Sequence, residues 1–162
     1  MDIWTEQLSR RHLSLLERWI GRGDGALTPN DLPSNTEELE AWFELCVAEQ
    51  GRLDCLALVY ETPVGLAGFR SCKAQDRTAV LYLLLGEVIY NPLRTATYVT
   101  LRMLDRAFLD NGLSCVIIRV HARFEWFLEV LERMGFSRTA VQDDLIILTV
   151  KKNDFLHRRY LF

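Results

Sequence analysis

The sequence has little of what marks fibrous, disordered or membrane-spanning proteins. Only 4 of its 162 residues are proline and 9 are glycine, whereas 49% are hydrophobic and 25% are charged. Collagen-like chains and disordered chains are excluded by this composition. The longest unbroken apolar run, residues 79–85, is far shorter than the roughly 20 residues of a membrane-spanning helix. We therefore expect one compact domain over residues 1–162 and no membrane partner.

Two further absences concern location and metal binding. The first six residues are acidic and lack the basic and apolar stretches of a secretory signal, so we expect a cytoplasmic protein. No C-x-x-C pair is present, which predicts reduced, packed thiols and no metal site. The four cysteines concerned are Cys46, Cys55, Cys72 and Cys115.

Positive charge is not clustered along the chain. The net charge is −3, and residues 1–50 carry four Arg against ten Asp or Glu. The remaining residues are mildly basic, but their Arg side chains alternate with acidic ones. A nucleic-acid partner is therefore not expected, because such a partner requires a basic face. A modest positive bias suits one anionic small molecule.

Apolar spacing predicts two helices near the start of the chain. The first covers residues 10–20 and ends at Gly21. The second follows Ser34 and Glu37, which stand at capping-box spacing. Its apolar side chains recur at helical intervals. They are Leu39, Trp42, Phe43, Cys46 and Val47.

The rest of the chain alternates between strand and helix patterns. Predicted strands are residues 55–60, 64–71, 78–87, 115–120, 138–140 and 145–150, and predicted helices are 96–108 and 124–134. The β-branched run 115–120 is predicted to be buried on both faces. A helix connects strands 78–87 and 115–120, so these two should lie parallel. The predicted class is α/β (α+β): a mixed, mostly antiparallel sheet of about six or seven strands with about four helices.

Local sequence adds a family resemblance, clearest in residues 101–120 and in V-L-E-R-M-G-F at 130–136, which is similar to a family pattern L-E-K-L-G-F. The chain resembles the GNAT N-acetyltransferase superfamily, in its branch that acetylates ribosomal-protein N-termini and small amines. The resemblance implies a V-shaped splay between the fourth and fifth strands. It also implies transfer of an acetyl or other acyl group from acetyl-CoA to a primary amine of a small molecule, amino sugar or peptide N-terminus.

The family's loop for the coenzyme A pyrophosphate, R-G-x-G-x-A, falls on residues 91–96, where only Ala96 and the following Thr97 agree with the family. Pro92 removes one backbone N–H donor. Arg94 could replace lost donors with a guanidinium, or Asn91 could simply be the N-cap of a helix that begins at Pro92. The resemblance implies these cofactor-binding residues: Val88, Ile89, Asn91, Arg94, Thr95, Ala96, Thr97 and Phe124.

The fourth helix departs from the family as well. Phe124 and Phe127 stand where the branch has Asn and then Ser or Ala, and Leu131 replaces a Tyr that other branches use as general acid. These aromatic residues favour a core or a filled groove. Two alternatives to a coenzyme A enzyme therefore stay open: a GNAT-fold interaction or regulatory module without catalysis, and a transferase that uses another acyl carrier.

Three residues are candidates for the proton transfers of amine acylation. Glu87 is a candidate base at the end of the fourth strand, His121 a proton relay at the end of the fifth, and Tyr90 a proton donor to the leaving thiolate. The acidic pair Asp143-Asp144 is a candidate for attracting an amine substrate. Aromatic content also suggests a homodimer.

Overall fold

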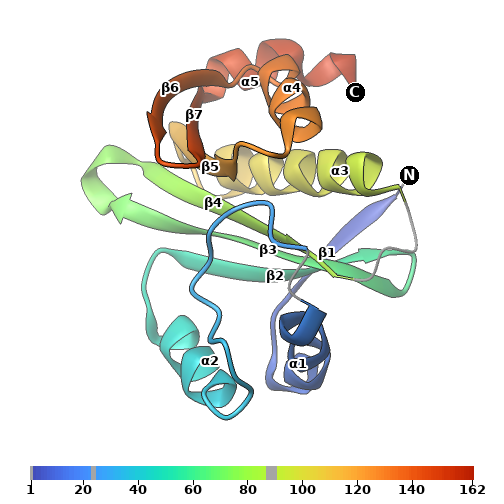
Figure 1. Ribbon diagram of the computed structural model, residues 1–162. Coiled ribbons are helices and arrows are strands. Elements are labelled where there is room, and N and C mark those ends of the chain that lie inside the picture. The colour runs from blue at the N-terminus through green and yellow to red at the C-terminus, as the bar shows by residue number, and fades with distance from the viewer. Residues whose placement is uncertain (1, 23–24, 87–90) are drawn as a thin grey trace.

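The computed structural model describes residues 2–22, 25–86 and 91–162, apart from the side chains of residues 21–22 and 72–74. Within these ranges a seven-stranded sheet forms the centre of the molecule (Figure 1). Its strands are β1 (Ile3–Gln7), β2 (Arg52–Val59), β3 (Thr62–Lys73), β4 (Thr78–Leu85), β5 (Cys115–His121), β6 (Ser137–Gln142) and β7 (Leu145–Lys151). They lie in the order β1-β2-β3-β4-β5-β7-β6.

Helices cover both faces of this sheet (Figure 1). The helices are α1 (Leu13–Arg22), α2 (Leu39–Ala48), α3 (Pro92–Asp105), α4 (Glu125–Arg133) and α5 (Lys152–Arg158). The first two lie on one face and the last three on the other, and α3 continues into a π-helical turn at Arg106–Asp110. Two apolar cores result, a smaller one under α1 and α2 and a larger one under the other three helices.

The fourth and fifth strands are parallel over only half of their length. Thr78–Leu81 pairs with Cys115–Ile118, whereas β2–β3, β3–β4, β5–β7 and the remaining neighbours are antiparallel. Beyond these pairs β4 continues to Leu85 and β5 to His121 without pairing with each other. The mixed sheet and the splay between its fourth and fifth strands were both predicted, and both are confirmed.

The amphipathic pattern of α3 explains how this crossover helix joins the two parallel strands. Its predicted apolar face is buried, with every member 1% exposed or less. The members are Ala96, Val99, Met103, Leu104, Ala107 and Phe108. Burying such a stripe stabilises a helix much more than intrinsic propensity does. Gly112, at φ +63°, follows the π turn in the left-handed conformation that commonly ends a helix.

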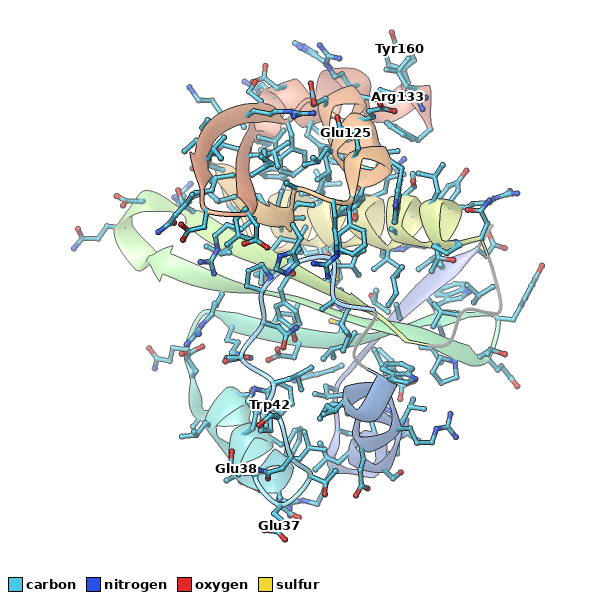
Figure 2. All side chains as sticks on the ribbon, viewed as in Figure 1. Glu37, Glu38, Trp42, Glu125, Arg133 and Tyr160 are labelled. Carbon is cyan, nitrogen blue, oxygen red and sulfur yellow. The ribbon has the colours of Figure 1, made fainter. Side chains whose placement is uncertain are left out.

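The predicted capping box before α2 is wrong. The helix begins at Leu39, and the amide N–H of Glu38 donates to the side-chain oxygen of Asn35 at 3.1 Å. Figure 2 shows Glu37 and Glu38 directed away from the sheet, whereas Trp42 lies on the inner side of the helix. Val47 was placed on the inner face but is 67% exposed, because at 100° per residue it lies roughly 90° around the helix from the centre of the buried face.

Two predictions on the second half of the chain are also wrong. Strand β5 is not buried on both faces: Val116, Ile118 and Val120 are buried, but Arg119 between them is exposed. Only the face toward α3 and α4 is covered by helices, so the other face of β5 stays accessible. Strand β7 is also followed by helix α5 and a short 3-10 helix at Arg159–Leu161, whereas the sequence predicted no helix after this strand.

Candidate functional site

The gap between the diverging ends of β4 and β5 is bridged by residues 25–28, here called the wedge. The amide of Leu27 donates to the carbonyl of Leu83 at 3.3 Å, and its own carbonyl accepts from the amide of His121 at 3.2 Å. Gly25 accepts from the amide of Leu85 at 2.7 Å. These backbone groups of β4 and β5 are therefore satisfied by the chain itself up to Leu85.

An apolar pocket of about 370 Å³ lies beside the wedge, where α3 and α4 begin. It is lined by Leu27, Leu85, Asn91, Pro92, Leu93, Phe124 and Trp126. A mostly apolar cavity of a few hundred Å³ with few polar groups is typical of small-ligand sites. Phe124 and Trp126 pack edge to face across 6.0 Å between ring centroids, so two aromatic rings form one wall.

The first turn of α3 supplies its own hydrogen-bond acceptor. The side-chain oxygen of Asn91 accepts from the amides of Leu93 and Arg94 at 3.0 and 3.4 Å, and its carbonyl accepts from Thr95 at 3.0 Å. Pro92 has no N–H to offer. The helix therefore begins at Pro92 with Asn91 as its N-cap, as one of the two interpretations of the sequence predicted.

The residues at this pocket fit one part of a coenzyme A molecule and not another. The apolar pocket fits a pantetheine arm with its acyl group, but the amide donors that would hold a pyrophosphate are bonded to Asn91. Arg94 is the cation at this helix start, and its guanidinium carbon lies 6.0 Å from the ring centroid of Tyr98. The described residues thus fit the thioester end of the molecule and do not fit its pyrophosphate.

The other cofactor-binding candidates on α3 face inward. Ala96 is fully buried, and the hydroxyl of Thr97 donates to the carbonyl of Leu93 at 2.6 Å. The buried hydroxyl of Thr95 has no hydrogen-bond partner among the described residues. Four further candidates lie outside the described residues: Glu87, Val88, Ile89 and Tyr90.

The structure brings His121 together with two other side chains. Its ring nitrogen Nδ1 lies 3.2 Å from a carboxylate oxygen of Asp144, and its ring centroid lies 6.4 Å from that of Phe124. The imidazole therefore contacts Phe124, which lines the apolar pocket, and it lies at the end of β5 that does not pair with β4. Asp144 was expected to attract an amine, and its pairing with His121 was missed because the turn between β6 and β7 is distant in sequence. The imidazole side chain is 22% exposed and the carboxylate 71%.

A second, polar cavity of about 410 Å³ lies on the opposite face of β4 and β5; we call it the arginine pocket. Its lining is Pro29, Asn30, Asp31, Glu49, Arg52, Arg70, Ser71, Val80, Tyr82 and Arg119. The rim at residues 29–31 continues directly from the wedge. Successive side chains of a strand point to opposite faces of the sheet. Leu81, Leu83 and Leu85 of β4 face α3, so Val80 and Tyr82 face the arginine pocket on the other side.

The floor of the arginine pocket rests on a buried ionic network. Arg52 binds Asp54 through Nε at 2.9 Å and Asp31 through Nη1 at 2.6 Å. The hydroxyl of Tyr82 donates to Asp54 at 2.5 Å, and burial raises the pKa of Tyr82. Hydrogen bonds from Arg52 lower the pKa of Asp31 to about 2. Gly68 permits this arrangement, since a Cβ there would lie 2.6 Å from the Tyr82 ring.

Thiol chemistry and metal chemistry find little support in the described residues. Burial raises the pKa of Cys46 to about 12 and that of Cys55 to about 11, so both remain protonated thiols near neutral pH. In the described parts of the chain, no three His, Cys, Asp or Glu side chains are grouped as metal ligands. No helix among these same residues is long and apolar enough to cross a membrane.

The sequence matches no family model and no curated protein sequence. Solved structures, in contrast, match almost end to end. A mutant form of the spermidine N-acetyltransferase SpeG from Vibrio cholerae is 14% identical at a TM-score of 0.82, with 96% of this chain and 99% of that chain covered. The same enzyme in complex with manganese ions is 14% identical at a TM-score of 0.76, with 96% of each chain covered.

A chimera of SpeG from Vibrio cholerae and hSSAT is also similar, at 14% identity and a TM-score of 0.82, with 98% of this chain and 100% of that chain covered. The chain has the GNAT fold. At this identity the likeness establishes the arrangement of strands and helices, and the activity has to be argued from the residues themselves. In this chain residues 25–28 bridge the splay between β4 and β5, and the apolar pocket lies beside that bridge.

Proposed function

We propose that the protein is an N-acyltransferase that moves an acyl group from a thioester to the primary amine of a small molecule. One observation carries the proposal: the parallel strands β4 and β5 separate beside an apolar pocket, and His121 stands at that opening next to Phe124. The similarity to spermidine N-acetyltransferases supports the same class of reaction.

His121 is the residue that prepares the amine. A primary ammonium must lose a proton before its nitrogen can attack, and an imidazole accepts a proton near neutral pH. Asp144 binds Nδ1, which leaves Nε2 of the ring to take the proton. The carboxylate also stabilises the imidazolium that results. This division of roles makes His121 the general base and Asp144 its positioning residue.

Balanced acyl transfer then forms one bond and breaks another. The amine nitrogen attacks the thioester carbonyl and a C–N bond forms; the C–S bond then breaks to release a thiolate, the nitrogen loses one proton to become the amide, and the thiolate takes up one proton, so the number of protons balances. The wall of Phe124 and Trp126 excludes water from the thioester, which limits hydrolysis. Tyr90 remains our candidate proton donor to the thiolate, and Glu87 an alternative base.

The acyl donor is acetyl-CoA or a related pantetheine thioester. The apolar pocket supports the pantetheine portion in either case. The amides of Leu93 and Arg94 already donate to Asn91 and are not available to a pyrophosphate. This favours a second candidate function, a GNAT-fold interaction module without catalysis. Binding measurements separate the two.

The first experiment compares donors by calorimetry and thermal shift. Acetyl-CoA, CoA and S-acetylpantetheine are titrated into the full chain. A donor present at about 100 times its Kd stabilises the fold by about 2.7 kcal/mol, which raises Tm measurably. Binding of S-acetylpantetheine with an affinity close to that of acetyl-CoA would agree with a missing pyrophosphate site. If none of the three binds, the acyltransferase proposal fails and the interaction module is favoured.

The second experiment measures release of free thiol in the presence of amines. We expect His121→Gln to lower kcat at pH 7 by about 10²- to 10⁴-fold, the usual contribution of a general base. His157→Gln is the matched control, because His157 is exposed on α5. Equal rates in the two variants would remove His121 from the mechanism.

A further inference from the structure

Three arginines and three carboxylates lie in or under the arginine pocket, but they are not paired one to one. Arg52 is only 4% exposed, and its guanidinium is shared between Asp31 and Asp54. Arg70 is hydrogen-bonded to Glu49 and lies 3.6 Å from Asp31. Each carboxylate in or under the pocket therefore already faces a guanidinium.

Arg119 is different from the other two arginines of the pocket. It projects from β5 and is exposed, and among the described residues it has no hydrogen bond, ion pair or ring contact. Its neighbour across the sheet is Ile147 of β7, and β4 has already diverged at this level. No carboxylate among the described residues pairs with the guanidinium of Arg119, so this cation is available to a ligand in the pocket.

Arg119 also shares a face of β5 with His121. Side chains two residues apart on a strand point to the same side, with their Cα atoms roughly 7 Å apart. The proposed base and the unpaired guanidinium are thus neighbours along the accessible face of β5. A small molecule with an amine at one end and an acid group at the other can span them.

We propose that the acceptor is a small amine that also bears an anionic group, a carboxylate or a phosphate, and that Arg119 binds this group. The inference rests on the proposed function and adds the class of acceptor to it. The guanidinium offers two parallel N–H donors to such an oxyanion. The amine end then lies toward His121, which follows Arg119 on the same face of β5.

The same charge discriminates against polycations. The similar SpeG structures are named as spermidine N-acetyltransferases, and spermidine is a polycation. In the arginine pocket a polycation would meet the unpaired Arg119, while the carboxylates Asp31 and Glu49 are already occupied by Arg52 and Arg70. Unfavourable juxtaposition of like charges is an effective means of rejecting a ligand.

Matched pairs of acceptors test the proposal in the thiol-release assay. The pairs are L-leucine with isopentylamine, and O-phosphoethanolamine with ethanolamine, and spermidine is added as a polycation. We expect kcat/KM for at least one acidic member to exceed that of its neutral-tailed partner by about 10- to 100-fold, the range of a charge-assisted hydrogen bond. The pair with the larger ratio tells whether the anion is a carboxylate or a phosphate.

The variant Arg119→Gln should raise KM for the acidic member by a similar factor and leave its partner within about twofold. Arg158→Gln, on the exposed side of α5, is the control and should change neither. A wild-type preference for spermidine, or equal losses on both members of a pair, would overturn the inference while acyl transfer itself stands. Absence of acylation of every amine would instead count against the proposed function.

A binding measurement gives an independent readout. Thermal shift with L-leucine or O-phosphoethanolamine alone, without a thioester, should raise the Tm of the wild type and not that of Arg119→Gln. An identical shift in both proteins would place the anion elsewhere.

Discussion

Arg52 binds Asp31 through both terminal guanidinium nitrogens, at 2.6 and 2.9 Å, and Trp42 donates its indole N–H to the same carboxylate at 3.0 Å. These bonds join β2 and α2 to the segment between α1 and α2. That segment carries the wedge and one rim of the arginine pocket. This carboxylate therefore anchors the segment to β2 and α2, in addition to the backbone hydrogen bonds that join the wedge to β4 and β5.

Removal of this carboxylate should destabilise the fold. We expect Asp31→Asn to lower the free energy of unfolding by about 1–3 kcal/mol, because Arg52 stays buried with one partner fewer. Partial exposure of Asp31 keeps the loss below that of a fully buried pair. Urea denaturation measures it, with the exposed Asp110→Asn as control. An unchanged urea midpoint in both variants would contradict the role of Asp31.

The effect of Asp31 should depend on pH in one direction. Its pKa falls from an ordinary value of 3.8 to about 2 in the folded protein, so it contributes stability that is fully present above the unfolded value. That contribution is lost as the pH falls through about 2. The difference in unfolding free energy between wild type and Asp31→Asn should therefore be constant from pH 5 to 7 and shrink on acidification below about pH 4. Urea titrations at several pH values test this, and a difference that grows on acidification would be the wrong sign.

Loss of the N-cap of α3 should have a smaller, local cost. Asn91→Ala removes the acceptor for the amides of Leu93 and Arg94, and we expect a loss of about 1 kcal/mol. Asn91→Asp keeps an acceptor oxygen and should retain most of the stability. Thermal unfolding compares the three proteins. Equal losses in both variants would show that the cap is not what stabilises this turn.

A methyl group cannot be added to the end of β4 without displacing a ring. A Cβ at Gly86 would lie 2.2 Å from a ring carbon of Trp19, so Gly86→Ala should cost about 1–3 kcal/mol through overpacking. In a double-mutant cycle, Trp19→Leu should reduce the cost of the alanine, since the two positions are in contact. Additive losses across the cycle would mean that the contact does not determine the cost.

Repeated local spacing accounts for most of the fold that could be predicted. The stripe on α3, the meander of β2, β3 and β4, and the crossover to a parallel β5 all follow from periodicity and from short connections. The start of α2 was misplaced because Ser34 and Glu37 satisfy a capping pattern that the chain does not use. The burial of β5 was misjudged because apolar residues on a strand do not reveal which of its faces a helix covers.

Few of the contacts at the site could be predicted in the same way. Asn91 and Pro92 indicate a helix start by themselves, because capping involves neighbouring residues. The contact of His121 with Asp144 joins residues in β5 and in the turn after β6, and the contact of Arg52 with Asp31 joins β2 to a loop. Neither position carries a local signal for its partner.

Periodicity and capping are properties of adjacent residues, so the amino-acid order alone was sufficient for the α/β class and for a parallel crossover, and it offered a helix start at Pro92 as one of two interpretations. Packing decided the rest. It placed the wedge between β4 and β5, left one face of β5 without a covering helix, and, among the described residues, gave Arg52 and Arg70 of the arginine pocket carboxylate partners but gave Arg119 none. Those outcomes depend on which segments meet in space, because a charge is free or paired only according to what the folded chain brings beside it.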